Sequence, residues 1–401
     1  MTNKKLKILF IPADNIKANI SRSYYFAKGL AKYSDLYFLT WNDYRSIEWL
    51  GGKKSKLNTI KCFLSSFFVS YKLYKNNNED FQRVKSSVFI DAIIGRLIGK
   101  VNAKKIMRKH NSKSLKKIIN RINPDVVFYS DACYFFPAFD NANFTQVIDI
   151  QDDIDWSKLP VNLQEYEKNY RLNQYKKVDI HYIVSKNALE NVTKNIGSFP
   201  FKVIYNGSDF KEIQKDFSKE INDVKNKLNL HDKYIITHIG SATWVDPVFT
   251  EKLFSAIWEK DKSIVLILVG SMKKINLPNV INVGMVSANN SYIYYRLTDL
   301  GLLLKDSKNS NFLYNSVPLK NIQYATAEKP VISFPIQWLE NEKFNNTRII
   351  KNTDPEKWLI EIQDIRSNFK WSEKDTIQWK KYDWEIICND MFKEIEKNLK
   401  S

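Results

Sequence analysis

The chain has 401 residues, of which 44% are hydrophobic and 14% aromatic, so it can bury a sizeable core and its length favours two or three domains. Its three cysteines lie far apart in the sequence and form no metal-ligand spacing, which fits a reducing cytoplasm. The apolar part of the first fifteen residues is too short for a signal peptide, and no stretch approaches the length of a membrane span. We therefore expect a globular protein that is neither exported nor integral to a membrane.

The net charge of +18 is concentrated in one part of the chain. Residues 53–121 hold 18 Lys and Arg against Glu79, Asp80 and Asp91, so this stretch carries about +15. Within it, "CFLSSFFVSYKLYK" and "VFIDAIIGRLIGKVNAKKIMRKHNSKSLKKIINRI" alternate apolar and basic positions at helical spacing. This pattern favours contact with an anionic membrane surface, while an ordinary solvated basic face stays open. Nucleic acid is disfavoured, because no zinc finger, helix-turn-helix or aromatic RNA-binding signature accompanies the charge.

In chain order, strands and helices alternate along the first half of the sequence. "KILFIPA" is a strand, "SRSYYFAKGLAKY" an amphipathic helix and "DLYFLTW" a second strand. The basic helical region 53–121 follows, and then "PDVVFYS", "QVIDIQD", "IHYIVS" and "KVIYNG" are further strands. This order predicts a parallel sheet covered by helices.

After the polar segment "SDFKEIQKDFSKEINDVKNKLNLHDK" the alternation begins again with "YIITHIG", "SIVLILVG", "VINVG", "LGLLLK" and "PVISFP". We therefore expect an N-terminal domain over residues 1–207, a C-terminal domain over 208–370, and a terminal helix in 371–401 that returns to the N-terminal domain. The predicted fold class is α/β, with two doubly wound Rossmann-like domains facing each other across a cleft. Ligands of such sheets bind at the carboxyl ends of the strands.

Several common reaction classes lack their motifs here. No GxGxxG follows the first strand, and "GRLIGKV" has neither the spacing nor the hydroxyl of a P-loop, which disfavours dinucleotide oxidoreductases and ATPases. The four histidines are isolated, and no GxSxG or HExxH is present, so the hydrolase templates also fail. No cofactor motif remains.

Lys320 is unusual for its place in the sequence. It follows Pro318, which suits the first turn of a helix, and it precedes the strand "PVISFP". A lysine at the positive end of a helix gains nothing from the dipole and is better tolerated beside an anion, of which phosphate is the obvious candidate. Gly240 and Ser241, in "HIGSATWVDPVF", come after a strand and before a helix, where backbone N–H groups can face a phosphate.

Seven segments together resemble the GT-B glycosyltransferases, in the order found in that family. They are "SRSYYFAKGLAKYSDLYFLTW", "VIDIQDDIDW", "VDIHYIVSKNALENV", "VIYNGSDF", "HIGSATWVDPVF", "ILVGSM…LPNVINVGMV" and "PLKNIQYATAEKPVISFP". The chain is similar to glycosyltransferase family 4 and to the family 70 glucuronosyltransferase GumK, in which a lysine is followed three residues later by glutamine and tyrosine. The resemblance implies an N-terminal domain that binds the acceptor and a C-terminal domain that binds a nucleotide-sugar.

The resemblance also implies a donor site. Lys320 would meet the donor diphosphate, Gly240 and Ser241 would lie beside it, and the nucleobase would lie at Met285 and Val286. The same pocket would be shared by Asn315, Ser316, Gln323 and Tyr324. A solvated helix lysine is the alternative for Lys320, and ordinary core or loop positions are the alternative for Met285 and Val286.

One departure from family 4 bears on the mechanism. Its retaining members have two glutamates eight residues apart where this chain has Asn315 and Gln323, which are neutral. This substitution favours an inverting reaction with a carboxylate base. By resemblance Asp152 is the first candidate for that base and Asp153 the second, within a group that also contains Asp149 and Asp155. Helix capping or turn formation is the alternative role of these aspartates.

Asp153 and Asp155 form a DxD, the metal-binding motif of another glycosyltransferase fold. We give this reading little weight, because GT-B enzymes usually offset diphosphate charge with lysine and helix N-termini, and we expect neither a metal nor a cofactor.

The sequence thus predicts a cytoplasmic glycosyltransferase that moves a sugar from a nucleoside diphosphate carrier to a lipid-linked or polysaccharide acceptor in bacterial envelope or exopolysaccharide synthesis. It would lie peripherally at the inner face of the plasma membrane. Two alternatives are a non-catalytic glycan-binding or scaffold protein of the same fold and a basic nucleic-acid-binding protein.

Overall fold

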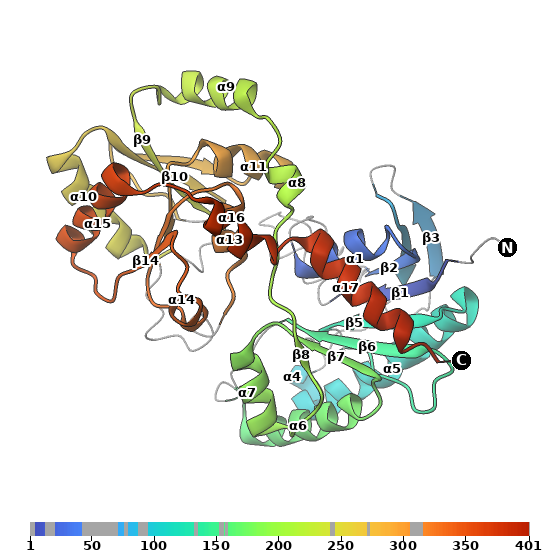
Figure 1. Ribbon diagram of the computed structural model, residues 1–401. Helices are drawn as coiled ribbons and strands as arrows, with labels where there is room; N and C mark the ends of the chain where they lie inside the picture. Colours follow the sequence, from blue (N-terminus) through green and yellow to red (C-terminus); the bar gives the residue numbers. More distant parts are fainter. Residues whose placement is uncertain are drawn as a thin grey trace, which may run out of the picture. The chain divides into compact units, whose positions relative to one another are not determined.

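The protein is described by a computed structural model, in which the chain divides into two compact units (Figure 1). Unit 1 comprises Met1–Ile204 and Cys388–Ser401, and unit 2 comprises Tyr205–Ile387. The structure describes residues 5–12, 21–41, 71–75, 79–86, 95–131, 135–151, 156, 159–240, 245–270, 273–304 and 316–400.

Unit 1 is built on an eight-stranded sheet of order β3-β4-β2-β1-β5-β6-β7-β8. Every neighbouring pair is parallel except β3 and β4. The strands are β1 (Lys7–Ile11), β2 (Asp35–Trp41), β3 (Tyr71–Lys75), β4 (Gln82–Ser86), β5 (Val126–Ser130), β6 (Thr145–Ile150), β7 (Ile180–Ile183) and β8 (Lys202–Val203).

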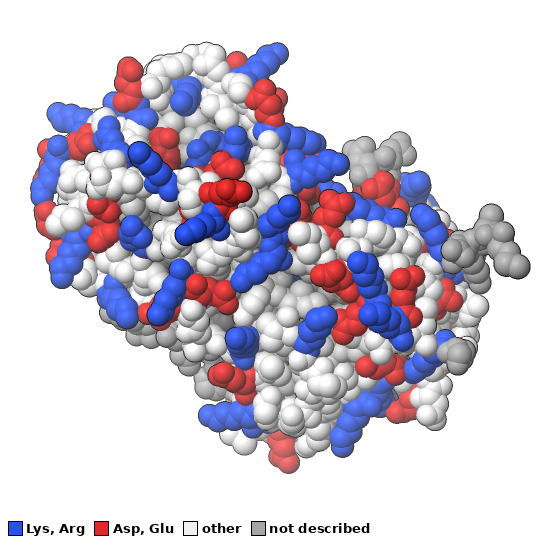
Figure 2. Space-filling view, in the orientation of Figure 1, with Lys and Arg blue, Asp and Glu red and all other residues white. Residues whose placement is uncertain are grey.

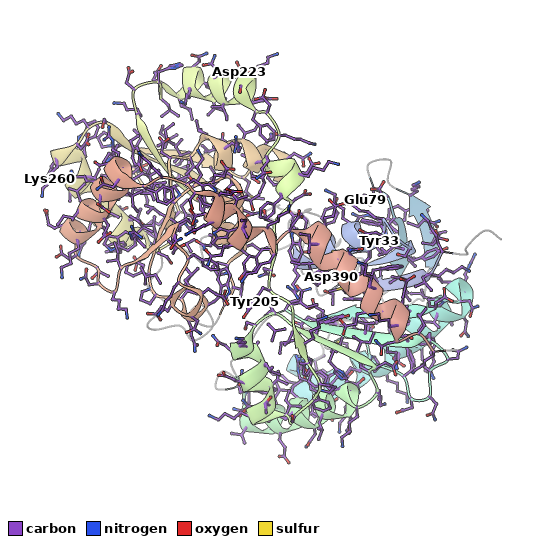
Figure 3. All side chains as sticks on the ribbon, viewed as in Figure 1. Tyr33, Glu79, Tyr205, Asp223, Lys260 and Asp390 are labelled. Atoms are coloured by element: carbon purple, nitrogen blue, oxygen red, sulfur yellow. The ribbon has the colours of Figure 1, made fainter. Side chains whose placement is uncertain are left out.

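The central strands of unit 1 are apolar runs because helices cover both faces of a parallel sheet. Phe10 of β1 stacks on Phe38 of β2 and on Phe128 of β5, with ring centroids 5.6 and 4.8 Å apart. The helices are α1 (Arg22–Leu30), α4 (Gly95–Ile98), α5 (Lys100–Ile122), α6 (Val161–Tyr175) and α7 (Lys186–Asn195), with the last part of α17 (Trp384–Lys397). Phe392 of α17 stacks on Tyr33, labelled in Figure 3, at a centroid distance of 5.2 Å.

Unit 2 is built on a six-stranded sheet of order β11-β10-β9-β12-β13-β14, in which all neighbouring strands are parallel. Its strands are β9 (Tyr234–Ile239), β10 (Ile264–Val269), β11 (Val280–Gly284), β12 (Leu300–Leu303), β13 (Val331–Ser333) and β14 (Thr347–Ile349). Its helices are α8 (Phe210–Ile213), α9 (Ser218–Leu228), α10 (Pro247–Lys260), α11 (Ala288–Leu297), α13 (Leu319–Thr326), α14 (Gln337–Glu342), α15 (Pro355–Asn368) and α16 (Glu373–Lys380).

An apolar cluster joins the helices of unit 2 to its sheet. Phe249 of α10, Trp358 of α15 and Phe334 after β13 meet with ring centroids 4.9 to 5.1 Å apart. A second aromatic cluster holds α16 in this unit, where Trp379 stacks on Phe344 at 3.9 Å. The first cluster holds α10, which connects β9 to β10, and α15, which follows the last strand, β14. The second cluster holds α16, which also follows β14.

The structure differs from the sequence prediction in the basic region 53–121. Residues 71–75 and 82–86, expected to be helical, form the strands β3 and β4 at the edge of the sheet. "YKLYK" alternates with a period of two, and lysines are common on edge strands, where charge discourages pairing with other chains. Residues 53–70 lie outside the described part of the chain.

The last segment of the chain is shared between the units. Residues 371–387 belong to unit 2, and residues 388–401 belong to unit 1, where Lys202 Nζ lies 2.6 Å from Glu394 Oε2. The sequence predicts a terminal helix in 371–401 that returns to the N-terminal domain, and the part of α17 from Cys388 onward belongs to unit 1.

Candidate functional site

Three glycines mark the carboxyl edge of the unit 2 sheet. Gly240 follows β9, Gly270 follows β10 and Gly284 ends β11, and their φ values of +142°, +131° and +81° lie in the region that favours glycine. A Cβ on Gly270 would lie 1.8 Å from the Gly240 carbonyl oxygen, so no other residue fits there. At Gly284 a Cβ would meet no atom within 4 Å, so this end of the edge has open space, and ligands of such sheets bind at the carboxyl ends of the strands.

Lys320 lies against this edge. It is in the first turn of α13, its side chain is only 7% exposed, and its Nζ lies 2.6 Å from the position that a Cβ on Gly240 would take. Burial holds the pKa of this ammonium well below that of an ordinary lysine, because the charged form loses its hydration. The structure thus brings together Lys320 and Gly240, which are 80 residues apart in the sequence.

The sequence predicts that backbone N–H groups at this edge can face a phosphate, but several of those in the described residues already have hydrogen-bond acceptors. The Gly240 N–H donates to the Val269 carbonyl at 2.8 Å within the sheet. At the start of α10 the Asp246 carboxylate already accepts from the N–H groups of Val248 and Phe249, at 3.0 and 3.1 Å. The missing side chain of Gly240 leaves room for the Lys320 amine, while its N–H is already used within the sheet. Ser241 lies outside the described residues.

Gln323 and Tyr324 are buried beneath the site. The Tyr324 hydroxyl lies 2.9 Å from both the side-chain and the carbonyl oxygen of Thr237, and its ring fills the space where a Cβ on Gly301 would lie. Gln323 Oε1 accepts from the Tyr295 hydroxyl at 2.6 Å. These contacts hold α13 on the sheet and on α11. Tyr324 is fully buried, so it supports the position of Lys320 and does not line the predicted pocket.

The other predicted donor residues lie around the same edge or outside the described chain. Met285 directly follows Gly284 and is 73% exposed, and Val286 is half-buried. Ser316 lies just before α13. Asn315 is not among the described residues.

In unit 1 the predicted acids follow β6. Asp149, the last residue but one of this strand, is fully buried and receives Arg22 Nη2 at 2.7 Å and Nε at 3.0 Å. A carboxylate paired in this way is poorly suited to accept a proton from a substrate. Asp152, Asp153 and Asp155 lie outside the described residues.

Sequence analysis did not identify the polar network around Asp149. Arg22 Nη2 also donates to the Ile204 carbonyl at 2.7 Å, and Gln151 donates to the hydroxyls of Ser23, at 2.6 Å, and Ser130. A signal was present, because Arg22 begins α1 directly after its N-cap Ser21, and a cation at a helix N-terminus indicates a nearby acid. This network fixes the backbone at the start of the segment that contains Asp152.

Among the residues that the structure describes, no three His, Cys, Asp or Glu side chains lie close enough together to share a metal ion. No helix in the same part of the chain is both long and apolar enough to cross a membrane.

Neither a protein-family model nor a curated protein sequence matches the chain. Its fold is nevertheless similar to solved structures over nearly the full length. HepE from Anabaena, solved with UDP, has a TM-score of 0.63 at 11% identity, covering 98% of this chain and 100% of its own. The E. coli trehalose-6-phosphate protein bound with UDP-2-fluoro glucose has a TM-score of 0.63 at 10% identity, with 98% and 99% covered.

WaaG, a glycosyltransferase involved in lipopolysaccharide biosynthesis, has a TM-score of 0.56 at 12% identity, with 98% of each chain covered. These similarities support the general resemblance to GT-B glycosyltransferases, while family 4 and GumK remain predictions. With its two parallel-sheet α/β units, the chain has the GT-B fold.

Proposed function

We propose that the protein is a glycosyltransferase that takes a sugar from a UDP-sugar and transfers it to a glycan or lipid-linked acceptor. The observation that carries this proposal is the buried Lys320 ammonium at the glycine-lined edge of the unit 2 sheet, on a fold shared with proteins solved with UDP or UDP-sugars. Uridine is proposed as the nucleobase because of these neighbours.

The proposed donor site depends on the charge of Lys320 and on the small residues beside it. A diphosphate beside Lys320 restores the charged form of the amine, and a charge-assisted hydrogen bond of this kind contributes about 1.5 to 3 kcal/mol. Gly240 leaves room for the Lys320 amine at the edge of the sheet, Gly284 has open space beside it, and Met285 and Val286 lie where we place the nucleobase. This site uses lysine rather than a metal ion to offset the diphosphate charge.

For the chemical step we propose inversion. Asp152 takes the proton of the acceptor hydroxyl while that oxygen attacks the anomeric carbon, the bond to the diphosphate breaks, and UDP leaves from the opposite face. Asp153 is the second candidate. Asp149 is not proposed as the base, because Arg22 occupies its carboxylate.

We further propose that the acceptor belongs to envelope or exopolysaccharide synthesis and is reached at the inner face of the plasma membrane. Helix α5 supports this part of the proposal, because it has exposed lysines and no acidic residue. Leu97 of α4 and Ile106 of α5 add apolar side chains that are 81% and 46% exposed. Lysines with exposed apolar residues are typical of surfaces that bind anionic lipid.

Figure 2 shows acidic and basic side chains interspersed over the face it displays, so the membrane proposal rests on α4 and α5 rather than on the charge of the whole molecule.

The test is a thermal-shift screen with UDP, GDP, CDP and dTDP, followed by a transfer assay with UDP-sugars. UDP should raise the melting temperature more than the other nucleotides, since a ligand at 100 times its Kd adds about 2.7 kcal/mol to the free energy of unfolding. No stabilisation by any nucleotide would contradict the donor site. Binding of UDP-sugars without hydrolysis or transfer would instead favour the non-catalytic glycan-binding alternative, and salt-dependent binding to duplex DNA would favour the nucleic-acid alternative.

A further inference from the structure

Unit 2 has a cavity of about 280 Å³ at the amino edge of its sheet, the edge opposite to the glycines. Tyr234 begins β9, Asp299 directly precedes β12, and Lys329 and Pro330 precede β13. The end of α15 and the segment after it supply the rest of the lining, which includes Ile365, Arg366, Phe369 and Trp371, and Glu328 completes it. Because β9 has six residues and a strand rises about 3.3 Å per residue, this cavity is about 20 Å from Gly240.

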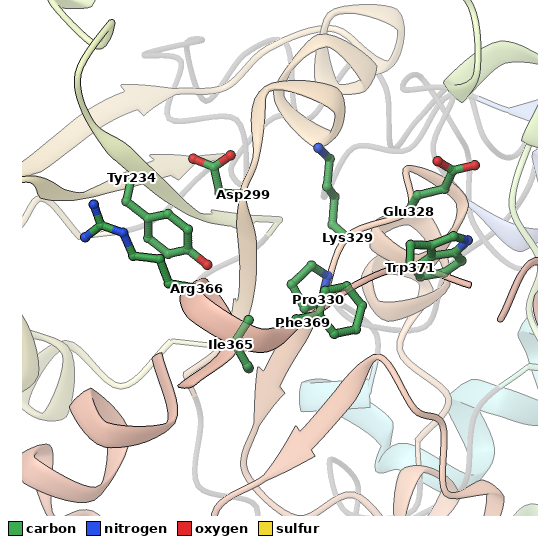
Figure 4. Close-up of a pocket in the computed structure, with 9 residues that line it drawn as sticks. All are labelled: Tyr234, Asp299, Glu328, Lys329, Pro330, Ile365, Arg366, Phe369 and Trp371. Carbon is green, nitrogen blue, oxygen red and sulfur yellow. The ribbon is translucent and has the colours of Figure 1, made fainter. Parts of the chain in front are cut away.

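Three of the nine lining residues, Tyr234, Phe369 and Trp371, carry aromatic rings, and the rings of Tyr234 and Trp371 are held by defined contacts. The Trp371 indole N–H donates to Thr376 Oγ1 at 2.9 Å, which holds the ring by its edge. The Arg366 guanidinium lies 5.1 Å from the centroid of the Tyr234 ring and donates to Asp261 at 3.0 Å. Figure 4 shows Tyr234 and Arg366 on one side of the cavity and Glu328 and Trp371 on the other. Preorganised aromatic faces of this kind suit a rigid ring with an apolar face.

The charges around the cavity are mixed. Two carboxylates, Asp299 and Glu328, accompany the two cations Lys329 and Arg366, and Asp299 also accepts the Ile235 N–H at 2.7 Å. Because the two carboxylates and the two basic side chains offset one another, the lining has no excess of either charge. The balance favours a neutral ligand that offers both donors and acceptors of hydrogen bonds.

A second cavity of about 270 Å³ adjoins the first. Ile365 and Phe369 line both, so the two cavities meet at these side chains. The rest of the second lining is amide, hydroxyl and charged: Asn345, Arg348, Asp364, Asn368, Lys370, Ser372 and Asp375. Each cavity is near the lower end of the range for small-molecule sites, which is about 300 to 1,000 Å³.

We propose that these adjoining cavities form a glycan-binding site that holds two successive parts of a neutral oligosaccharide. A sugar ring has an apolar face that packs on an aromatic side chain and hydroxyls that pair with carboxylates, amides and ammonium groups. The two-cavity arrangement matches a chain of such rings rather than a single one. This inference goes beyond the proposed function, because the cavities share no residue with the candidate donor site.

The test uses the full-length protein labelled with 5-fluorotryptophan, in which the Trp371→Phe variant assigns the fluorine resonance of Trp371. Maltohexaose, cellohexaose and chitohexaose are titrated one at a time, with UDP as a fourth titrant. At least one hexasaccharide should shift the Trp371 resonance saturably. Trp371→Ala should weaken its binding at least tenfold, and so should Lys329→Gln, which leaves the contact between Trp371 and Thr376 intact.

Trp258→Ala is the matched control, because Trp258 is a half-buried tryptophan of α10 with a lysine, Lys262, 5.6 Å from its ring centroid, and it lines neither cavity. Its hexasaccharide affinity should equal that of the unaltered protein. The proposal fails if no hexasaccharide shifts the Trp371 resonance, if UDP alone shifts it, or if both cavity variants bind like the control. The titration needs no nucleotide-sugar donor. The glycan-binding proposal can therefore fail while the sugar-transfer assay succeeds, and the transfer assay can fail while glycan binding is observed.

Discussion

Burial of the Lys320 amine lowers its pKa, because the charged form loses its hydration. Between the folded pKa and the ordinary lysine pKa of about 10.4, the unfolded chain binds more protons than the folded one, so stability rises with pH over that interval. Lys320→Met removes the cost of burying the charge. The free energy of unfolding of this variant, measured by denaturant titration, should be about 0.5 to 2 kcal/mol higher than that of the unaltered protein at neutral pH. The difference should shrink as the pH approaches about 10.4.

The same variant should lose donor affinity. Removing the cation that faces the diphosphate should weaken UDP binding by about 1.5 to 3 kcal/mol, as measured by calorimetric titration. Lys260→Met is the control, because Lys260, labelled in Figure 3, is an exposed lysine of the same unit paired with Glu356. Unchanged UDP affinity in Lys320→Met, or an equal loss in Lys260→Met, would reject the assignment.

Gly240 should tolerate no side chain. In Gly240→Ala the new Cβ would lie 2.6 Å from Lys320 Nζ and 3.0 Å from Cε, at a φ of +142°. The lysine would have to move, so UDP binding should fall at least tenfold in the calorimetric titration. Gly197→Ala separates this effect from backbone strain, because Gly197 has a φ of +140° but its Cβ would meet no atom closer than 3.8 Å. Equal UDP affinity in the two variants would show that the contact with Lys320 does not matter.

At the scale of the element, α5 tests the membrane proposal. Lys109 and Lys113 lie one turn apart on its exposed face, and each basic residue near an anionic bilayer adds about 1 kcal/mol at most. Lys109→Glu with Lys113→Glu should therefore reduce sedimentation with anionic vesicles by tenfold or more, while binding to neutral vesicles stays unchanged.

The matched variant changes Lys219 and Lys227 to Glu on α9, another exposed helix, in unit 2. It should sediment like the unaltered protein. If both pairs reduce sedimentation equally, the effect reflects net charge, and α5 is an ordinary solvated face.

At the scale of the whole molecule, the two proposed roles lie on different units. Lys320 belongs to unit 2, and Asp152 belongs to unit 1. Asp152→Asn should therefore keep the UDP affinity but lose most transfer, since the amide has the shape of the carboxylate but cannot take the proton. NMR of the product should show an inverted anomeric configuration. A retained configuration, or full activity in both Asp152→Asn and Asp153→Asn, would return the enzyme to the retaining class.

The sequence alone determined the two α/β units and pointed to the strand edge at which we propose that the donor binds. Long apolar runs such as "IVLILV" of β10 need a core on both sides, and glycines directly after such runs mark the carboxyl ends of strands. Lys320 could be singled out for the same reason, because a cation at the start of a helix is a local conflict that is visible without neighbours.

Only the tertiary structure decided which polar groups pair. Arg22 and Asp149 are 127 positions apart, and their pairing removed Asp149 from the candidate bases. Tyr324, which the motif placed in the pocket, proved to be held under it by Thr237, 87 positions away. The cavity next to Trp371 likewise gathers residues from three strand starts and one helix end. Hydrophobic periodicity is a property of neighbours along the chain, whereas burial and hydrogen-bond partners depend on which distant segments the sheet order places together.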